Sequence, residues 1–178
     1  MPDLYKKYKE DVVPALTQQR GYKNIMEVPK LRKIVLSCGI GSDAERDAFQ
    51  EAKKQLAAIT GQMPVITKAR KNVANFKLRV GMLNGAMVTL RGSRMYEFLD
   101  RYVHVALPRV RDFRGISKKG FDGAGNYNVG CPDITIFTEV DPDTLKYPLG
   151  FNITMVTSAK TDAEARDLLK LMELPFAE

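Results

Sequence analysis

The sequence predicts an α+β fold in which helices cover one face of a mostly antiparallel sheet and leave the other face open. Three observations lead to this fold class. Short segments alternate between polar and apolar residues, as half-buried strands do, while longer segments carry one apolar stripe, as surface helices do. The helices are segregated from the strands, which favours an α+β architecture. With 178 residues, 44% of them apolar, the chain can bury one ordinary core.

The chain begins with the pattern of a charged helix over residues 3–20. We expect a single domain over residues 1–178, with this helix as an N-terminal extension over about residues 1–22. Pro14 should kink the helix because it lacks a backbone donor. Residues 31–38 then alternate as a strand. The apolar stripe of the helix consists of Leu4, Tyr8, Val12 and Leu16.

A second helix is expected to begin at Ser42 or Asp43, either of which can cap it, and to end at about Thr60. Its buried stripe consists of Ala48, Phe49, Ala52, Leu56 and Ile59. Residues 64–68 and 86–91 then alternate as strands. The connection between these strands is long and has no clear period. Such connections in a compact domain are usually functional or disordered.

The C-terminal half should contain a helix over residues 94–111, followed by a glycine-rich loop at residues 120–127 whose tip is exposed and mobile. Two strands are expected near residues 133–138 and 151–158. The last helix, over residues 161–174, opens with a capping box. The buried stripes of the two helices are Met95, Phe98, Leu99, Tyr102, Val103 and Ala106, then Ala165, Leu168, Leu169 and Met172.

Basic residues are concentrated in the middle of the chain. Residues 61–119 hold 13 Lys and Arg against 3 Asp and Glu, whereas residues 120–178 hold 4 against 10. The stretch Thr67–Gly81 carries five basic residues, two Asn and one Phe, but no acid. These groups bind phosphates, base edges and an unstacked base, respectively. The pattern predicts nucleic-acid binding. Amide side chains on a flexible loop suit the splayed bases of irregular RNA better than the major groove of DNA, so RNA is the expected partner.

The predicted strands would place polar side chains on the open face of the sheet. Hydroxyls, amides and cations on such a face suit a sugar-phosphate backbone, although the same face could simply be solvated. The side chains expected there are Lys33, Ser37, Thr89, Arg91, Asn152 and Thr154. A second basic segment leads into the glycine-rich loop and contains Arg109, Arg111, Arg114, Lys118 and Lys119.

One pattern is typical of an enzyme. Gly39–Ala44 reads Gly-x-Gly-x-x-Ala between a strand and a helix, as in dinucleotide-binding folds, so an NADP-binding enzyme is the main alternative. Against it, Asp43 would repel a pyrophosphate at the start of the helix, and no series of βαβ units follows. A tight turn with a helix cap explains the same residues.

The remaining residues predict neither catalysis nor a cofactor. His104, the only histidine, lies in an apolar helical run and is expected to pack there. Cys38 and Cys131 lie far apart and should be reduced, buried thiols. No catalytic triad or metal-ligand spacing can be assembled, and no signal peptide or membrane-spanning run is present, which predicts a cytoplasmic protein. A protein-binding adaptor that uses the acidic C-terminal region stays open as a third class.

Several motifs occur together and in order along nearly the whole chain. They are Val28-Pro29, Ile59-Thr60-Gly61-Gln62, the Thr67–Gly81 stretch, Val88-Thr89-Leu90-Arg91, Pro108-Arg109-Val110-Arg111-Asp112-Phe113-Arg114-Gly115, Phe121-Asp122-Gly123-Ala124-Gly125-Asn126-Tyr127 and Leu174-Pro175-Phe176. With these motifs the chain closely resembles the family of bacterial large ribosomal subunit protein five. The resemblance implies a structural protein of the central protuberance that binds 5S rRNA and helps attach it to 23S rRNA.

The same resemblance implies further partners and assigns residues to them. P-site tRNA would meet Lys68, Arg70, Lys71, Asn72, Asn75, Phe76, Lys77 and Arg79, on a loop that we expect to be mobile until tRNA or the ribosome orders it. The 5S rRNA would lie on the open sheet face, which the resemblance extends to Gln62. The second basic segment would bridge to small-subunit protein thirteen. Other central-protuberance proteins would be neighbours, and no homo-oligomer is expected.

Two positions depart from the family pattern. Ser37 stands where the family usually has Asn, which shortens the reach of one expected RNA hydrogen bond. Cys131-Pro132-Asp133 replaces a segment that usually carries Arg and Glu, so an RNA contact by that Arg would be missing.

Overall fold

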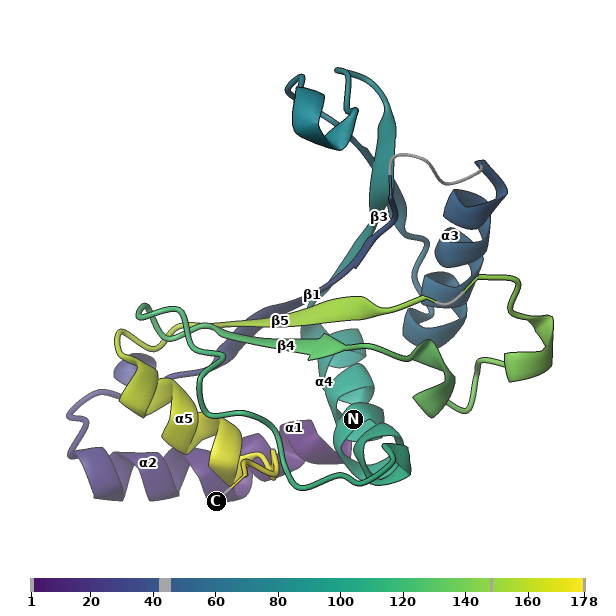
Figure 1. Ribbon diagram of the computed structural model, residues 1–178. Coiled ribbons are helices and arrows are strands. Elements are labelled where there is room, and N and C mark those ends of the chain that lie inside the picture. Colours follow the sequence, from purple (N-terminus) through teal and green to yellow (C-terminus); the bar gives the residue numbers. More distant parts are fainter. Residues whose placement is uncertain (1, 42–45, 148, 178) are drawn as a thin grey trace. The chain divides into compact units, whose positions relative to one another are not determined.

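Within residues 2–41, 46–147 and 149–177, which the computed structural model describes, five strands form an open antiparallel sheet in the order β2-β3-β1-β5-β4 (Figure 1). The strands are β1 Leu31–Gly39, β2 Val65–Lys68, β3 Leu83–Leu90, β4 Tyr127–Cys131 and β5 Phe151–Thr157. The helices are α1 Asp3–Lys7, α2 Val13–Arg20, α3 Arg46–Thr60, α4 Gly92–Arg101 and α5 Asp162–Leu171. The predicted α+β fold class is confirmed.

Residue contacts divide the chain into two compact units. The first unit comprises Met1–Ile34, Arg91–Val129 and Thr154–Glu178, and the second comprises Val35–Leu90 and Gly130–Ile153. Strands β1, β4 and β5 therefore each contribute residues to both units.

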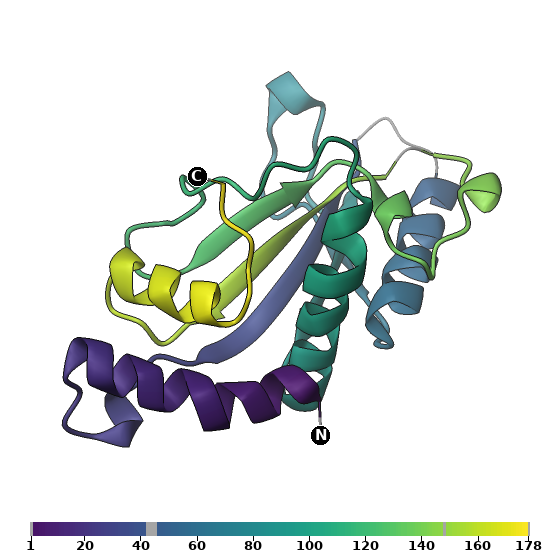
Figure 2. The same cartoon turned by 90° about the horizontal axis from the view of Figure 1, so that it is seen from below.

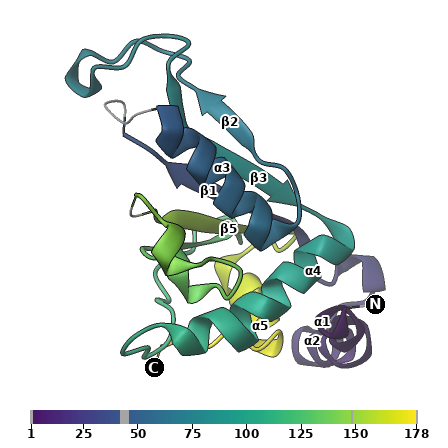
Figure 3. The same cartoon turned by 90° about the vertical axis from the view of Figure 1, so that its right-hand side faces the viewer.

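In the second unit, α3 packs against β3 and β2 (Figure 3). All five residues of its predicted stripe are buried, as are Ala86, Val88 and Leu90 on β3. Strands β2 and β3 pair with Val65 opposite Met87. Gly61, at φ +64°, ends α3 in the left-handed region that glycine adopts without a Cβ penalty. The expected caps of α3, Ser42 and Asp43, lie outside the described residues.

In the first unit, the N-terminal helix runs as α1, a π-helical turn over Tyr8–Val12, and α2. Pro14 lies in the first turn of α2, where its missing N–H is tolerated, and the wider π-helical turn comes directly before it. The four predicted stripe residues are all buried. Helix α1 packs against α4 (Figure 2). The ring centres of Tyr5 and Tyr96 lie 4.9 Å apart at this contact.

Helix α4 begins two residues earlier than predicted and continues as a π-helical turn over Tyr102–Ala106 and a 3-10 turn over Leu107–Arg109. Every residue of its predicted stripe is buried. Helix α5 begins after Thr161, whose hydroxyl accepts a hydrogen bond from the Glu164 N–H at 3.4 Å. The Glu164 carboxylate accepts in return from the Lys160 N–H, one residue before the cap. The predicted stripe of α5 is also buried.

The strand predicted near residues 133–138 is wrong. Residues Ile134–Ile136 form a 3-10 turn, because Pro132 cannot donate a ladder hydrogen bond and the Asp133 carboxylate caps the Thr135 N–H at 2.8 Å. The strand lies earlier, in β4, whose first residue was predicted to be loop. The Asp141-Pro142-Asp143 segment opens a short 3-10 turn, which the Asp141 side chain caps.

Candidate nucleic-acid interface

The long basic connection between β2 and β3 is a hairpin, which we call the basic hairpin, residues 69–82 (Figure 1). The Ala69 N–H donates to the Met82 carbonyl at 2.8 Å. Further out, Val73 and Leu78 exchange two backbone hydrogen bonds of 2.9 and 3.0 Å. The connection is therefore paired at its base and near its tip, which its irregular sequence pattern did not predict.

The tip of the basic hairpin is a 3-10 turn over Ala74–Phe76. It ends at Lys77, which has the left-handed φ of +52° that is uncommon for a residue with a Cβ. The side-chain oxygen of Asn72 accepts from the Val80 N–H at 2.8 Å and so joins the two sides of the hairpin. Asn72 thus holds the backbone, while Phe76 has 68% of its surface exposed.

All five cations of the Thr67–Gly81 stretch, four on the basic hairpin and Lys68 at the end of β2, are exposed: Lys68, Arg70, Lys71, Lys77 and Arg79. None of them forms an ion pair with a carboxylate in the described part of the chain. Their charge is therefore not neutralised by neighbouring carboxylates. An exposed cluster of cations of this kind favours a polyanionic partner.

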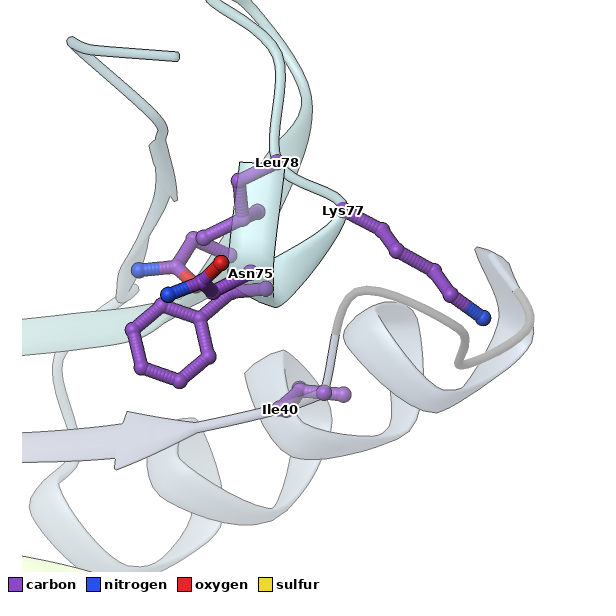
Figure 4. A pocket seen from close by; sticks show the side chains of 7 residues that line it. Ile40, Asn75, Lys77 and Leu78 are labelled. Carbon is purple, nitrogen blue, oxygen red and sulfur yellow. The ribbon is translucent and has the colours of Figure 1, made fainter. Parts of the chain in front are cut away.

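A hollow of about 500 Å³ lies between the hairpin tip and the sheet. Figure 4 shows the side chains of Asn75 and Leu78 above Ile40, while the side chain of Lys77 extends away from them. The ring of Phe76 and the amide of Asn84 also line it. The hollow thus combines an apolar floor, one aromatic ring and two amides, which are groups that stack on and hydrogen-bond a nucleobase.

A second groove, of about 770 Å³, lies at the base of the basic hairpin. Lys68 and Arg79 line it together with Arg46, from the start of α3, above an apolar floor that includes Phe49. Sequence reasoning missed Arg46 because it lies outside the acid-free stretch and next to acidic residues along the chain. The fold brings it to the hairpin base, where it adds to the positive charge.

Four of the predicted sheet-face residues belong to the second unit, namely Ser37, Gln62, Thr89 and Asn152. The structure brings two of them together, because the Gln62 amide donates to the Thr89 carbonyl at 3.1 Å. The Thr60 hydroxyl accepts from the Gln62 N–H at 3.3 Å and holds the turn after α3. Ser37 is half-buried on β1, whereas Asn152 is exposed on β5.

The other three predicted sheet-face residues, Lys33, Arg91 and Thr154, belong to the first unit. Lys33 and Thr154 are half-buried on β1 and β5, and Arg91 is exposed. Arg91 was predicted to end a strand, but β3 ends at Leu90 and Arg91 is the N-cap residue of α4. Its side chain therefore extends from the start of a helix.

All five cations of the second basic segment are exposed: Arg109, Arg111, Arg114, Lys118 and Lys119. The chain between them is anchored at Ile116, which is buried and donates its N–H to the Pro175 carbonyl at 2.7 Å. Ile116 also accepts from the Ala177 N–H at 3.0 Å. The cations therefore lie on both sides of a fixed point rather than on one free loop.

The tip of the glycine-rich loop is exposed, as predicted, but it is held by carboxylates. Asp162, in the first turn of α5, accepts from the N–H groups of Gly123 at 3.1 Å and Gly125 at 2.9 Å. Asp122 accepts from the side-chain amide of Asn126 at 2.7 Å and from the backbone N–H groups of Asn126 and Ala124. These hydrogen bonds lower the pKa of the Asp122 carboxyl group, and that of the Asn126 side chain has the largest effect.

The prediction that His104 packs in the apolar core is wrong, because its side chain is half exposed. Its two ring nitrogens lie 2.9 Å from carboxylate oxygens of Asp100 and Glu173. Burial lowers the pKa of His104, but the hydrogen bonds with these carboxylates outweigh it and raise the pKa above its ordinary value. Glu173 also pairs with Lys7, whose hydrogen bond is the main reason that the pKa of Glu173 is lowered.

The two cysteines are free and buried, as predicted. Burial raises the pKa of both thiols, that of Cys131 to about 11, so neither is a thiolate at neutral pH. Among the described residues, no group of His, Cys, Asp and Glu is arranged to hold a metal ion. No helix in the described ranges is long and apolar enough to cross a bilayer.

Comparison with known proteins decides the family. The sequence model of the C-terminus of the ribosomal L5 family matches residues 84–176, and that of ribosomal protein L5 matches residues 24–79. The chain belongs to the ribosomal protein L5 family. It is 54% identical over 178 residues to large ribosomal subunit protein uL5 of Carboxydothermus hydrogenoformans and 57% identical over 177 residues to that of Citrifermentans bemidjiense. Each alignment covers 99% of both chains.

Membership of the L5 family makes the protein a structural, non-enzymatic constituent of the large ribosomal subunit in the cytoplasm. The family confirms the resemblance drawn from the motifs and contradicts the alternative of an NADP-binding enzyme. The NADP-binding alternative came from the Gly39–Ala44 pattern, of which Ser42, Asp43 and Ala44 lie outside the described residues. The L5 family identity is also consistent with RNA binding.

Proposed function

We propose that this L5-family protein binds 5S rRNA and helps attach it to 23S rRNA in the central protuberance. In this proposal the basic hairpin contacts P-site tRNA, and the segment from Arg109 to Lys119 bridges to small-subunit protein thirteen. Other proteins of the central protuberance are its neighbours, and the protein acts as one copy.

The observation that carries the proposal is the set of exposed cations on the basic hairpin, none of which forms an ion pair with a carboxylate in the described ranges. Each cation that meets a phosphate releases condensed counterions, and this release drives association. The aromatic and amide lining of the hollow beside the tip supports an RNA partner, because bases can stack and hydrogen-bond there.

The proposed 5S rRNA site consists of Lys33, Ser37, Gln62, Thr89, Arg91, Asn152 and Thr154. Support comes from their chemistry, since each of the seven offers a hydroxyl, amide or cationic group and is at least partly exposed. Gln62 and Thr89 support each other through their hydrogen bond. Ser37 has a shorter side chain than the Asn usual in the family, so we propose that its RNA contact is weaker.

The test of 5S rRNA binding is its salt dependence. We expect the logarithm of the binding constant to fall linearly with the logarithm of the salt concentration, by about 0.7–0.9 per neutralised phosphate. Filter binding of purified protein to 5S rRNA at several salt concentrations measures this slope. Absence of binding, or an affinity that salt does not change, would contradict the proposal.

The division between 5S rRNA and tRNA contacts requires matched variants. The pair Thr89→Val and Arg91→Ala should weaken 5S rRNA binding more than the pair Lys77→Ala and Arg79→Ala, because the hairpin residues serve tRNA in this proposal. The surface variant Lys170→Ala, on α5, is the control for simple loss of charge. Equal or reversed effects of the two pairs would rule out this division of roles.

The inter-subunit bridge is tested by charge reversal. Lys118→Glu with Lys119→Glu should weaken association of the two ribosomal subunits, while 5S rRNA binding by the free protein stays unchanged. Both side chains are exposed and lie beyond the anchor at Ile116, so the fold should tolerate the change. Light scattering on mixing the subunits measures their association, and unchanged association would refute the bridge.

A further inference from the structure

A groove of about 730 Å³ in the first unit belongs to none of the RNA or bridge sites proposed above. It lies among the N-terminal helix, the connection that follows α2, and the start of α4. Its most exposed apolar residues are Ile25 and Met26, which have 74% and 77% of their surface exposed. Large apolar side chains at the rim of an apolar groove are typical of a surface that another molecule covers.

The rim is held in place by local hydrogen bonds. Ile25 and Met26 begin a 3-10 turn, and the Asn24 side chain accepts from the Met26 N–H at 2.9 Å. On the opposite side, the Tyr8 hydroxyl donates to the Pro29 carbonyl at 3.2 Å. The exposed apolar pair is therefore presented on a capped turn next to an anchored segment.

The charged residues that line the groove are all basic, although Arg32 and Met26 also line an adjoining groove that contains Glu27 and Glu164. Lys9, Lys30 and Arg32 line it, and none of its described lining residues is acidic. Neither Lys30 nor Arg32 forms an ion pair with a carboxylate among the described residues. A complementary occupant must therefore combine apolar side chains with negative charge.

RNA carries negative charge, but this groove offers little on which a base can stack. The Tyr5 ring already has the Lys9 ammonium 4.6 Å from its centre and the Tyr96 ring against it at 4.9 Å. Tyr8 and Tyr96 are 9% and 5% exposed, so their faces are covered as well. What remains accessible is mainly aliphatic, in contrast to the exposed Phe76 ring beside the hairpin hollow.

We propose that this groove binds an acidic segment of a neighbouring ribosomal protein, which inserts an apolar side chain against Ile25 and Met26. Carboxylates on either side of that apolar residue pair with Lys30 and Arg32. The resulting contact would have an apolar centre, at Ile25 and Met26, and a charged rim, at Lys30 and Arg32, as other protein interfaces do. The proposal rests on membership of a ribosomal protein family and not on any of the RNA contacts.

The experiment places a photo-crosslinking amino acid, p-benzoylphenylalanine, at position 26 of the full-length chain within purified large ribosomal subunits. Irradiation should join this position to one ribosomal protein. Mass spectrometry of the joined peptide should find an apolar residue at the crosslink with Asp or Glu within four residues of it. The same amino acid at Gln18, which is exposed but does not line the groove, is the control and should give at least tenfold less of this product.

The charge requirement is tested in the same subunits. Adding Lys30→Glu to the position 26 probe should reduce the crosslink at least fivefold, whereas Lys30→Arg should preserve it. Position 25 serves as a second probe site if the probe at position 26 prevents incorporation into the subunit. Crosslinking to rRNA, no crosslink from either probe site in assembled subunits, or a protein crosslink that Lys30→Glu does not change would each overturn the proposal.

Discussion

Replacement of Gly85 by alanine should destabilise the second unit, because the backbone of β1 lies directly against this position. A Cβ at Gly85 would overlap the carbonyl oxygen of Cys38 and lie 3.4 Å from the Cα of Gly39. Both neighbours are backbone atoms, which cannot turn away as a side chain can. Because Gly85 does not have a positive φ, the expected effect comes from this contact and not from backbone conformation.

The size of the effect follows from the kind of contact. Added methyl groups in well-packed sites cost about 1–3 kcal/mol, and relief here requires β1 to move away from β3, so we expect a loss of about 3 kcal/mol. For a chain of 178 residues, 1 kcal/mol shifts Tm by about 2–4 °C. The variant should therefore unfold about 6–12 °C below the natural protein, as measured by circular dichroism.

Gly39→Ala is the matched control for this prediction. Gly39 ends β1, no atom lies within 4 Å of the Cβ it would gain, and its φ is not positive. Alanine at position 39 should leave the free energy of unfolding unchanged or raise it by about 0.4–1 kcal/mol, because alanine lowers the conformational entropy of the unfolded chain. Equal Tm values for the two variants, or a Gly85→Ala variant that unfolds at the temperature of the natural protein, would refute a steric clash at Gly85.

Three further predictions concern the charged groups. Lys77→Ala with Arg79→Ala should reduce the salt dependence of P-site tRNA binding by about 1.4–1.8 in the log–log slope, measured on ribosomes that carry the variant. Asp162→Ala removes the acceptor of the Gly123 and Gly125 N–H groups, so hydrogen exchange of these amides should become at least tenfold faster by NMR. His104→Gln should lower Tm at pH 5.5 but much less at pH 8.5. The raised pKa of His104 gives stability that is complete below its ordinary value of 6.5 and is lost as pH rises through the folded pKa. The lowered pKa of its partner Glu173 gives stability that is complete above pH 4.5. The ion pair therefore stabilises the fold fully between about pH 4.5 and 6.5. Because both side chains are about half exposed, we expect an effect of about 1 kcal/mol or less. Equal shifts at both pH values would contradict this assignment.

The buried stripes of the helices could be predicted because they depend on spacing alone. Residues such as Phe49, Leu99 and Leu168 recur on one face of their helices, and all three are buried. The cap of α5 was predictable for the same reason, since Thr161 and Glu164 stand at a fixed separation. Such patterns are local, so one sequence is enough to find them.

One miss came from a local turn signal that was outweighed by an apolar run, and two came from residues far apart in the sequence. An apolar run around Ile134 and Ile136 resembles a strand, but the preceding Pro132 and the Asp133 cap turn it into a 3-10 segment. His104 was assigned to the core because its neighbours along the chain are apolar, whereas its partner Glu173 lies 69 residues away. Arg46 reaches the base of the basic hairpin only in the folded chain. No spacing rule could have joined His104 to Glu173, or Arg46 to the basic hairpin.

The pairing within the basic hairpin refines the expectation that this segment is mobile until tRNA or the ribosome orders it. Hydrogen bonds join Ala69 to Met82 and Val73 to Leu78, and Asn72 adds a third connection between them. Opening the hairpin requires breaking these bonds together, whereas the turn at its tip can move without breaking them. We therefore expect mobility to be graded, so that amides at the tip exchange fastest and those at the base slowest. A hairpin of this kind can extend cations away from the sheet and still let its tip adapt to a partner, which suits a transient contact better than a permanent one.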